Sequence, residues 1–102
     1  MEIAENTLKD WTWYSFTLNN IAMIPQISGV YCLGQNNNII YIGSSQNMYV
    51  RLTDHYYSDD PCIKQATQFA IESCTNYKER ERQQLRKFQM EHGRLPACND
   101  RI

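Results

Sequence analysis

The fold is decided by residues 29–43, which read Gly29-Val30-Tyr31-Cys32-Leu33-Gly34-Gln35-Asn36-Asn37-Asn38-Ile39-Ile40-Tyr41-Ile42-Gly43. Both ends of this stretch are apolar and rich in β-branched and aromatic residues, as strands are. The middle carries a glycine and three asparagines, which turns prefer. Two such runs around a short polar segment predict a β-hairpin with strands over 29–33 and 39–43.

A helix is predicted directly after the hairpin, over residues 47–57. The serines and the asparagine of residues 44–47 offer N-cap side chains. The apolar residues expected to face the core repeat every four positions and are Met48, Leu52 and Tyr56. Arg51 and His55 are also four residues apart, so they share a neighbouring face of this helix.

The remaining elements complete a small α+β pattern. Residues 68–73 alternate enough to form a third strand, and residues 76–92 form the longest predicted helix, ended by Gly93. The order predicts an α+β domain with a small three-stranded antiparallel sheet flanked by helices. We expect this domain to span residues 28–102, with residues 1–27 as an N-terminal extension packed on it.

Composition excludes several classes of protein. The chain has 102 residues, a formal net charge of -1 and 42% hydrophobic residues, which is typical of one globular domain. It has no apolar run long enough to span a membrane, and its acidic start does not resemble a secretory signal, so we expect a cytoplasmic protein. Residues 11–50 carry no charged side chain, so any chemistry there uses tyrosines, amides, hydroxyls and backbone.

The four cysteines have no spacing typical of a metal site. Cys62, Cys74, Cys98 and His92 could together be imagined as zinc ligands, but no known finger pattern has their spacing. Cysteines in a reducing compartment are mostly thiols. We therefore predict neither zinc nor a disulfide, and Cys32 as a buried thiol within a strand.

Three features of the sequence have both a structural and a chemical interpretation. Glu81 falls on the apolar stripe of the last helix, where a carboxylate is costly unless it pairs with a neighbour such as Arg82 or binds a metal. Tyr31 and Tyr41, one on each hairpin strand, can be packing residues or members of a site. The face shared by Arg51 and His55 can likewise be a solvated helix edge.

Taken together and in this order, these residues resemble the GIY-YIG nuclease family, which includes an excision-repair nuclease subunit, homing endonucleases and some restriction enzymes. The resemblance covers roughly residues 28–99. It rests on two tripeptides and the residues that follow them: Gly29-Val30-Tyr31, Tyr41-Ile42-Gly43, Ser45, Asn47, Arg51, His55, Glu81, Pro96 and Asn99. The first tripeptide has valine in place of isoleucine, and Ser44 stands where the repair enzyme has a lysine.

The resemblance implies hydrolysis of DNA phosphodiester bonds with one divalent ion, Mg²⁺ or Mn²⁺. Glu81 is then the protein ligand of the metal, and Arg51 contacts the phosphate. The two tyrosines flank the attacking water and one acts as base, with either assignment open. The other implied catalytic residues are His55, as proton relay, and Asn99, which docks the chain end near the phosphate or braces the tyrosines. We expect the strands and helices that carry these residues to bring Tyr31, Tyr41, Arg51, His55 and Glu81 to one cleft on one sheet face.

DNA is the implied partner, although the net charge gives no general attraction for it. We expect the contacts to DNA to come from residues near the second tripeptide and on the last helix: Ser45, Asn47, Arg51, Arg82, Arg86 and Lys87. A homo-oligomer or a protein partner can supply sequence specificity. The alternative function is a weakly active or inactive module on the same fold that binds nucleic acid or protein.

Overall fold

The structure, a computed structural model, describes residues 11–101. Along the chain it has β1 (Tyr14–Ser15), α1 (Leu18–Ile21), β2 (Gly29–Gln35), β3 (Asn38–Ser45), α2 (Met48–Tyr56), the short 3₁₀ helix η2 (Ile63–Gln65), β4 (Gln68–Ser73) and α3 (Tyr77–His92). The hairpin, the third predicted strand and both main helices are therefore confirmed.

The sheet is antiparallel and has four strands in the order β1-β4-β2-β3. The prediction of three strands is wrong because β1 was missed. This strand pairs only Tyr14 with Phe69 and Ser15 with Gln68, and two residues are too few to show an alternating pattern. Through β1 and α1, residues 11–27 contribute to the sheet and to the core; residues 1–10 lie outside the described part of the chain.

The hairpin turn explains why asparagines stand at its tip. Asn36 and Asn37 have φ angles of 54° and 65°, in the left-handed region that asparagine tolerates better than most residues. Two consecutive residues of this kind form the turn whose twist matches that of the two strands. The register places Leu33 opposite Tyr41 and Tyr31 opposite Gly43, so both tyrosines lie on the same face of the sheet.

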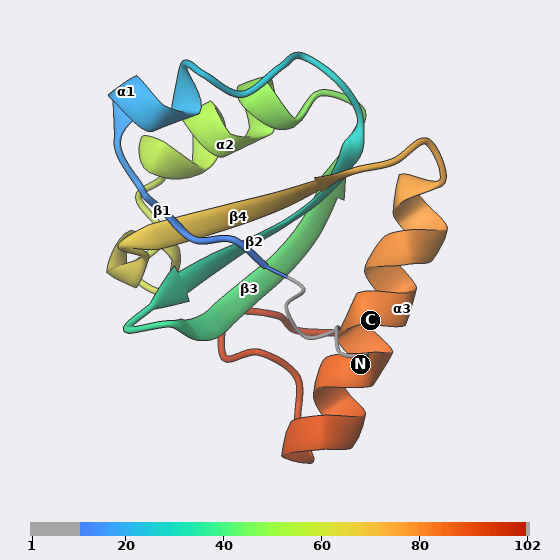
Figure 1. The fold of residues 1–102 in the computed structure, drawn as a ribbon. Coiled ribbons are helices and arrows are strands. Elements are labelled where there is room, and N and C mark those ends of the chain that lie inside the picture. Colours follow the sequence, from blue (N-terminus) through green and yellow to red (C-terminus); the bar gives the residue numbers. More distant parts are fainter. Residues whose placement is uncertain (1–10, 102) are drawn as a thin grey trace.

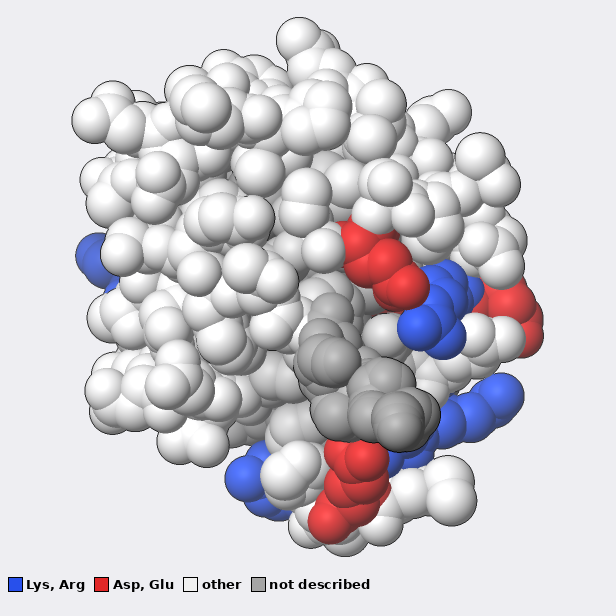
Figure 2. Space-filling view, in the orientation of Figure 1, with Lys and Arg blue, Asp and Glu red and all other residues white. Residues whose placement is uncertain are grey.

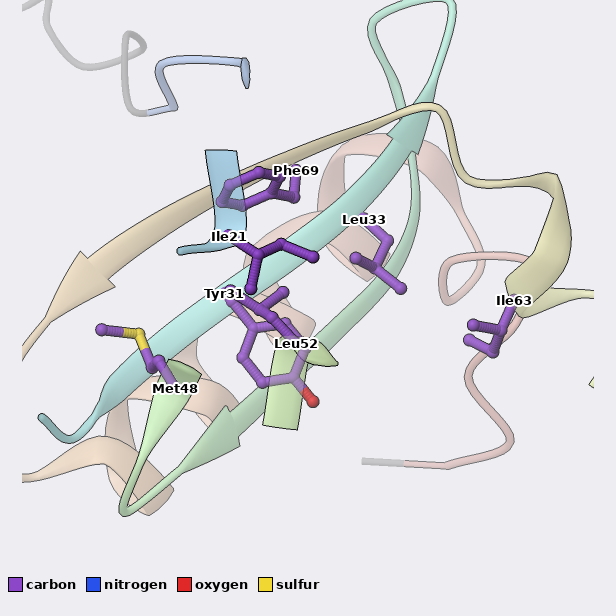
Figure 3. Packing of buried hydrophobic residues seen from close by; sticks show 7 residues of the cluster. All are labelled: Ile21, Tyr31, Leu33, Met48, Leu52, Ile63 and Phe69. Atoms are coloured by element: carbon purple, nitrogen blue, oxygen red, sulfur yellow. The ribbon is translucent and has the colours of Figure 1, made fainter. Parts of the chain in front are cut away.

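The helices cover both faces of the sheet, with α1 and α2 on one side and α3 on the other (Figure 1). Figure 3 shows the core between the sheet and the first two helices, made by Ile21, Tyr31, Leu33, Met48, Leu52, Ile63 and Phe69. The second core lies under α3 and contains Val30, Cys32, Ile42, Ala70, Leu85 and Phe88. Alternate strand residues thus enter opposite cores.

One predicted core residue is misplaced. Tyr56 is 40% exposed, and His55 is 8% exposed in its place. Spacing explains the difference, because a helix of 3.6 residues per turn brings position 55 closer than position 56 to the line through Met48 and Leu52. The helix therefore turns an imidazole into the protein interior.

The surface reflects the uneven distribution of charge along the chain, in which residues 11–50 carry no charged side chain. In the view of Figure 2, most charged side chains lie on the right and in the lower part, toward α3; one basic side chain shows at the left edge, and the upper surface over α1 shows none. None of the helices within residues 11–101 is long and apolar enough to cross a membrane.

Candidate active site

Two tyrosines and a histidine form the centre of the site. The Tyr31 hydroxyl lies 2.8 Å from His55 Nε2, which makes a buried hydrogen bond between β2 and α2. The ring centroids of Tyr41 and His55 are 5.2 Å apart, and those of the two tyrosines are 6.2 Å apart. The second helix and both hairpin strands therefore meet at three ring systems in mutual contact.

Burial fixes the protonation of this centre. Burial, and after it the nearby positive charge of Arg51, together lower the pKa of His55 to about 4. Burial, followed by the repulsion of Tyr41, raises the pKa of Tyr31, and Arg51 opposes this rise through a hydrogen bond and its charge. At neutral pH the pair is thus a protonated phenol next to a neutral imidazole, and the phenol can donate to Nε2.

We expect acid to destabilise the fold through His55. Between the pKa of about 6.5 of an unfolded histidine and the folded pKa of about 4, only the unfolded chain takes up a proton. The free energy of unfolding should therefore fall by about 3 kcal/mol as pH drops through this window, and this contribution should level off below it. Urea unfolding at several pH values measures the fall.

The matched variant for this prediction is His55→Gln, which cannot titrate. Titration of carboxylates elsewhere contributes to both proteins, so the difference between the two curves isolates His55. Parallel curves for wild type and variant across this pH range would contradict the buried neutral imidazole.

The lack of a side chain at Gly43 leaves space for the Tyr31 ring. A Cβ at this position would lie 2.6 Å from the Tyr31 hydroxyl oxygen and 2.8 Å from Cε2 of Tyr41. Both distances are shorter than real carbon contacts allow, so the rings would have to move. The glycine of the second tripeptide thus allows the Tyr31 side chain to cross over the backbone of β3.

We predict that Gly43→Ala displaces the tyrosines. The overpacking should lower the free energy of unfolding by about 1–3 kcal/mol and break the hydrogen bond from Tyr31 to His55. Gly93→Ala is the control, because it adds backbone strain at φ 73° with no atom within 4 Å. If the two variants lose stability equally and both keep the histidine resonances of the wild type in NMR spectra, the steric argument fails.

Two hollows in the surface lie on either side of Tyr41. The first, which we call the arginine hollow, is lined by Tyr41, Arg51, Asp54, His55, Ser58, Asp60, Ile63, Cys98 and Asp100. The second, the glutamate hollow, is lined by Tyr41, Glu81, Cys98, Asn99, Asp100 and Arg101. Tyr41 lines both, so a substrate that occupied both hollows would cross its ring.

Glu81 reaches the glutamate hollow from the α3 side of the sheet. Its Oε1 accepts a hydrogen bond from the Ser44 hydroxyl, which belongs to β3 and faces α3. The expectation that all five residues lie on one sheet face is therefore wrong: the tyrosines, Arg51 and His55 are on the α2 side. Tyr41 shares the glutamate hollow with Glu81 at the free edge of β3, the outermost strand, and the Glu81 charge is near enough to contribute to the raised pKa of Tyr31.

The Asn99 side chain forms two hydrogen bonds with the backbone of Ile42 on that free edge, which we call the Asn99 bracket. Its side-chain amide donates to the Ile42 carbonyl at 3.0 Å, and its Oδ1 accepts from the Ile42 amide at 2.9 Å. The side chain thus pairs with β3 as a neighbouring strand would. Of the two roles the resemblance implied, this geometry favours docking of the chain end beside Tyr41.

A disulfide joins Cys62 to Cys98, with Cα atoms 5.8 Å apart. The prediction that all cysteines are thiols is wrong for this pair. Sequence spacing could not reveal it, because the two residues are 36 positions apart and meet only when the C-terminal end folds back to η2. Cys32 and Cys74 are free, and Cys32 is buried as predicted.

The predicted nucleic-acid contacts are only partly brought together. Arg51 lines the arginine hollow. Ser45 and Asn47 instead stabilise the N-terminus of α2: the Ser45 hydroxyl bonds the Asn47 backbone, and Asn47 Oδ1 accepts from the Val50 amide at 3.1 Å. The three basic residues of the last helix lie outside both hollows: Arg82, which pairs with Glu79 at 2.9 Å, Arg86, which is exposed, and Lys87.

Among the residues of the site that sequence reasoning missed are Ser44, which donates to Glu81, and Asp100, which lines both hollows. The only signal for Ser44 was its place directly after the second tripeptide. Asp100 had the equally weak signal of following Asn99. Both are polar neighbours of residues that the pattern did identify.

The chain is similar to known proteins both in its sequence and in its fold. Residues 27–91 match the model of the GIY-YIG catalytic domain. Among solved structures, the chain is similar to the GIY-YIG N-terminal endonuclease domain of UvrC from Thermotoga maritima bound to magnesium, its catalytic divalent cation. The TM-score is 0.64 at 20% identity, over 79% of this chain and 92% of that chain.

A point mutant of the same domain, bound to its catalytic divalent cation, gives a TM-score of 0.65 at 20% identity, over 81% of this chain and 93% of that chain. At such identities the likeness shows the fold. No curated protein sequence matches the chain significantly. The family match covers more than half of the sequence and includes the hairpin, α2 and Glu81, and on this ground the chain belongs to the GIY-YIG family.

Proposed function

We propose that this chain is an endonuclease that hydrolyses DNA phosphodiester bonds with one divalent cation, Mg²⁺ or Mn²⁺. The family is one of nucleases, and the observation that carries the proposal for this chain is the hydrogen bond from Tyr31 to a neutral His55 beside Arg51. Tyr31 and His55 can transfer a proton beside the position where Arg51 can bind a phosphate.

The residues present fit a hard divalent cation. Glu81 supplies a carboxylate oxygen, Ser44 fixes the orientation of that carboxylate, and the glutamate hollow is open to the waters that Mg²⁺ retains. Within residues 11–101 no group of three or more acidic, histidine or cysteine side chains could hold an ion, so Glu81 would act with water ligands. A cation bound there would stabilise negative charge on the phosphate and on the leaving 3′ oxygen.

Arg51 is the proposed phosphate contact. It lines the arginine hollow, and its charge is near enough to the Tyr31 hydroxyl to oppose the rise in the pKa of Tyr31, so its guanidinium is at the wall of the site. A planar fork can donate to two oxygens at once, which suits the charge that develops on the phosphoryl group. The pair with Asp54 at 4.0 Å is exposed and leaves the fork free to exchange partners.

The proton of the attacking water has a path through Tyr31. Although its ring is buried, both partners of its hydroxyl line the arginine hollow, and Figure 3 shows the hydroxyl at the margin of the core cluster. As the water oxygen bonds to phosphorus, Tyr31 accepts the proton of the water and passes its own to His55 Nε2. No free phenolate is needed, so the raised pKa of Tyr31 does not prevent this role.

The test is incubation of the purified protein with supercoiled plasmid and Mg²⁺ or Mn²⁺. Nicked or linear product that disappears with a chelator supports the proposal. Binding to DNA without cleavage under any of these conditions would favour the module that only binds nucleic acid. DNA that is neither bound nor cut would overturn both functions.

A further inference from the structure

The Cys62–Cys98 disulfide lies in the wall of the candidate site. Cys62 belongs to the segment between α2 and η2, and Cys98 to the C-terminal tail, residues 93–101. Cys98 lines the arginine hollow and also the glutamate hollow. The cross-link is therefore located where the two parts of the site adjoin.

The C-terminal tail forms a wall that both hollows share. Cys98 and Asp100 line both of them, as Tyr41 does. In Figure 1 the tail leaves the lower end of α3 and returns to the sheet beside β3. The tail therefore lies between Glu81, which lines one hollow, and Arg51 and His55, which line the other.

The bonds that hold the tail go mainly to β3. The Cys98 amide donates to the Ile40 carbonyl at 2.8 Å, and the Asn99 side chain brackets Ile42. These contacts lie on either side of Tyr41. The disulfide adds a link to the opposite wall, because Asp60 and Ile63, close to Cys62, line the arginine hollow.

We infer that the Cys62–Cys98 disulfide positions the C-terminal tail against β3, so that the site is fully assembled in the oxidised protein and loosened in the reduced protein. This inference rests on the proposed nuclease function for its effect on rate, but not for its effect on structure. The cysteines are positioning residues, because they act through Asn99 and Tyr41.

The chemistry of the switch is thiol–disulfide exchange. A dithiol reductant supplies two electrons and two protons, the bond between the sulfur atoms breaks, and Cys62 and Cys98 become thiols while the reductant forms its own disulfide. Opening the bond removes a covalent constraint on a long loop, so the tail gains freedom at the place where Asn99 meets β3. In a compartment that keeps thiols reduced, the loosened form would predominate until conditions become oxidising.

The first experiment measures structure without any DNA. Amide hydrogen exchange is followed for the oxidised protein, for the protein reduced with dithiothreitol, and for the Cys62→Ser/Cys98→Ser variant. We expect faster exchange at Ile42 and Cys98, by at least about tenfold, in both forms that lack the bond. Amides shared by β2 and β4 should not change, which separates release of the tail from global unfolding.

The second experiment measures plasmid cleavage in Mg²⁺ with the same three forms. Loss of the bond should lower kcat about tenfold, since a small misplacement of reacting groups has a large effect on rate, and should leave KM within about twofold. Dithiothreitol should not affect the double variant. Cys74→Ser is the matched control, because it keeps the disulfide and should respond to dithiothreitol as the wild type does.

Asn99→Ala tests the route of the effect. If the disulfide acts through the Asn99 bracket, reduction should slow this variant much less than it slows the wild type. Equal exchange rates and equal kcat in the oxidised and reduced proteins would overturn the inference, as would failure of Cys62 and Cys98 to pair on oxidation. Faster exchange without cleavage by any form would overturn the nuclease function alone.

Discussion

Replacing Glu81 with alanine is expected to lower the rate of DNA cleavage by about three orders of magnitude. Glu81 is the only carboxylate on α3 that lines the hollows beside Tyr41, and Ser44 holds its orientation. Without it the site keeps Arg51, His55 and both tyrosines but loses the carboxylate that Ser44 orients. Single-turnover cleavage of plasmid in Mg²⁺ measures the loss.

DNA binding by Glu81→Ala should change little and can become tighter, because a carboxylate without its cation repels phosphate. Glu79→Ala is the matched control: it removes the same charge two residues away, from an exposed position paired with Arg82. Cleavage by Glu81→Ala at the wild-type rate in Mg²⁺ would exclude the one-metal mechanism. The chain would then be better described as a binding module on a nuclease fold.

The fold was predictable from the sequence wherever a pattern repeats. The hairpin could be recognised because each strand is long enough to show its apolar residues and because the asparagines at its tip suit the left-handed backbone found there. The helix that starts near Met48 follows from its spacing and its Asn47 cap. By contrast, β1 consists of Tyr14 and Ser15 alone, and its place beside β4 is fixed by tertiary pairing that no local pattern encodes.

The residues proposed for catalysis could be singled out one by one from the sequence, but their arrangement could not. Tyr31, Tyr41, Arg51, His55 and Glu81 were all singled out, yet sequence order does not say that Glu81 approaches from the other face of the sheet. That follows from β3 being the edge strand, which leaves room for side chains from both faces to meet around it.

The C-terminal tail shows the same limit more strongly. Cys98, Asn99 and Asp100 join the site only because the chain turns back after α3, beyond Gly93 with its φ of 73°. The contacts that hold the tail, from Asn99 to Ile42 and from Cys98 to Cys62, connect residues at least 36 positions apart. Long-range contacts of this kind leave no local pattern in the sequence.

Replacing Arg51 with alanine should slow cleavage by roughly 2–4 kcal/mol in activation free energy, as loss of an oxyanion donor does, and weaken DNA binding only modestly. Lysine should restore little of the rate, because one ammonium group cannot reach two phosphate oxygens and Tyr31 together. Lys64→Ala is the control: it removes one exposed positive charge from η2, outside both hollows.

The pH profile of these variants separates loss of the phosphate contact from loss of the proton path. Arg51 is, after burial, the largest influence that lowers the pKa of His55 to about 4. In Arg51→Ala that pKa should rise, although burial still keeps it below that of a free histidine, and the acid limb of kcat should move to higher pH with it. Arg51→Lys keeps the charge, so its acid limb should stay near that of the wild type while its rate stays low. An unchanged limb in Arg51→Ala would mean that His55 does not take up the proton in catalysis, and the path through Tyr31 would be wrong even if Arg51 contacts the phosphate.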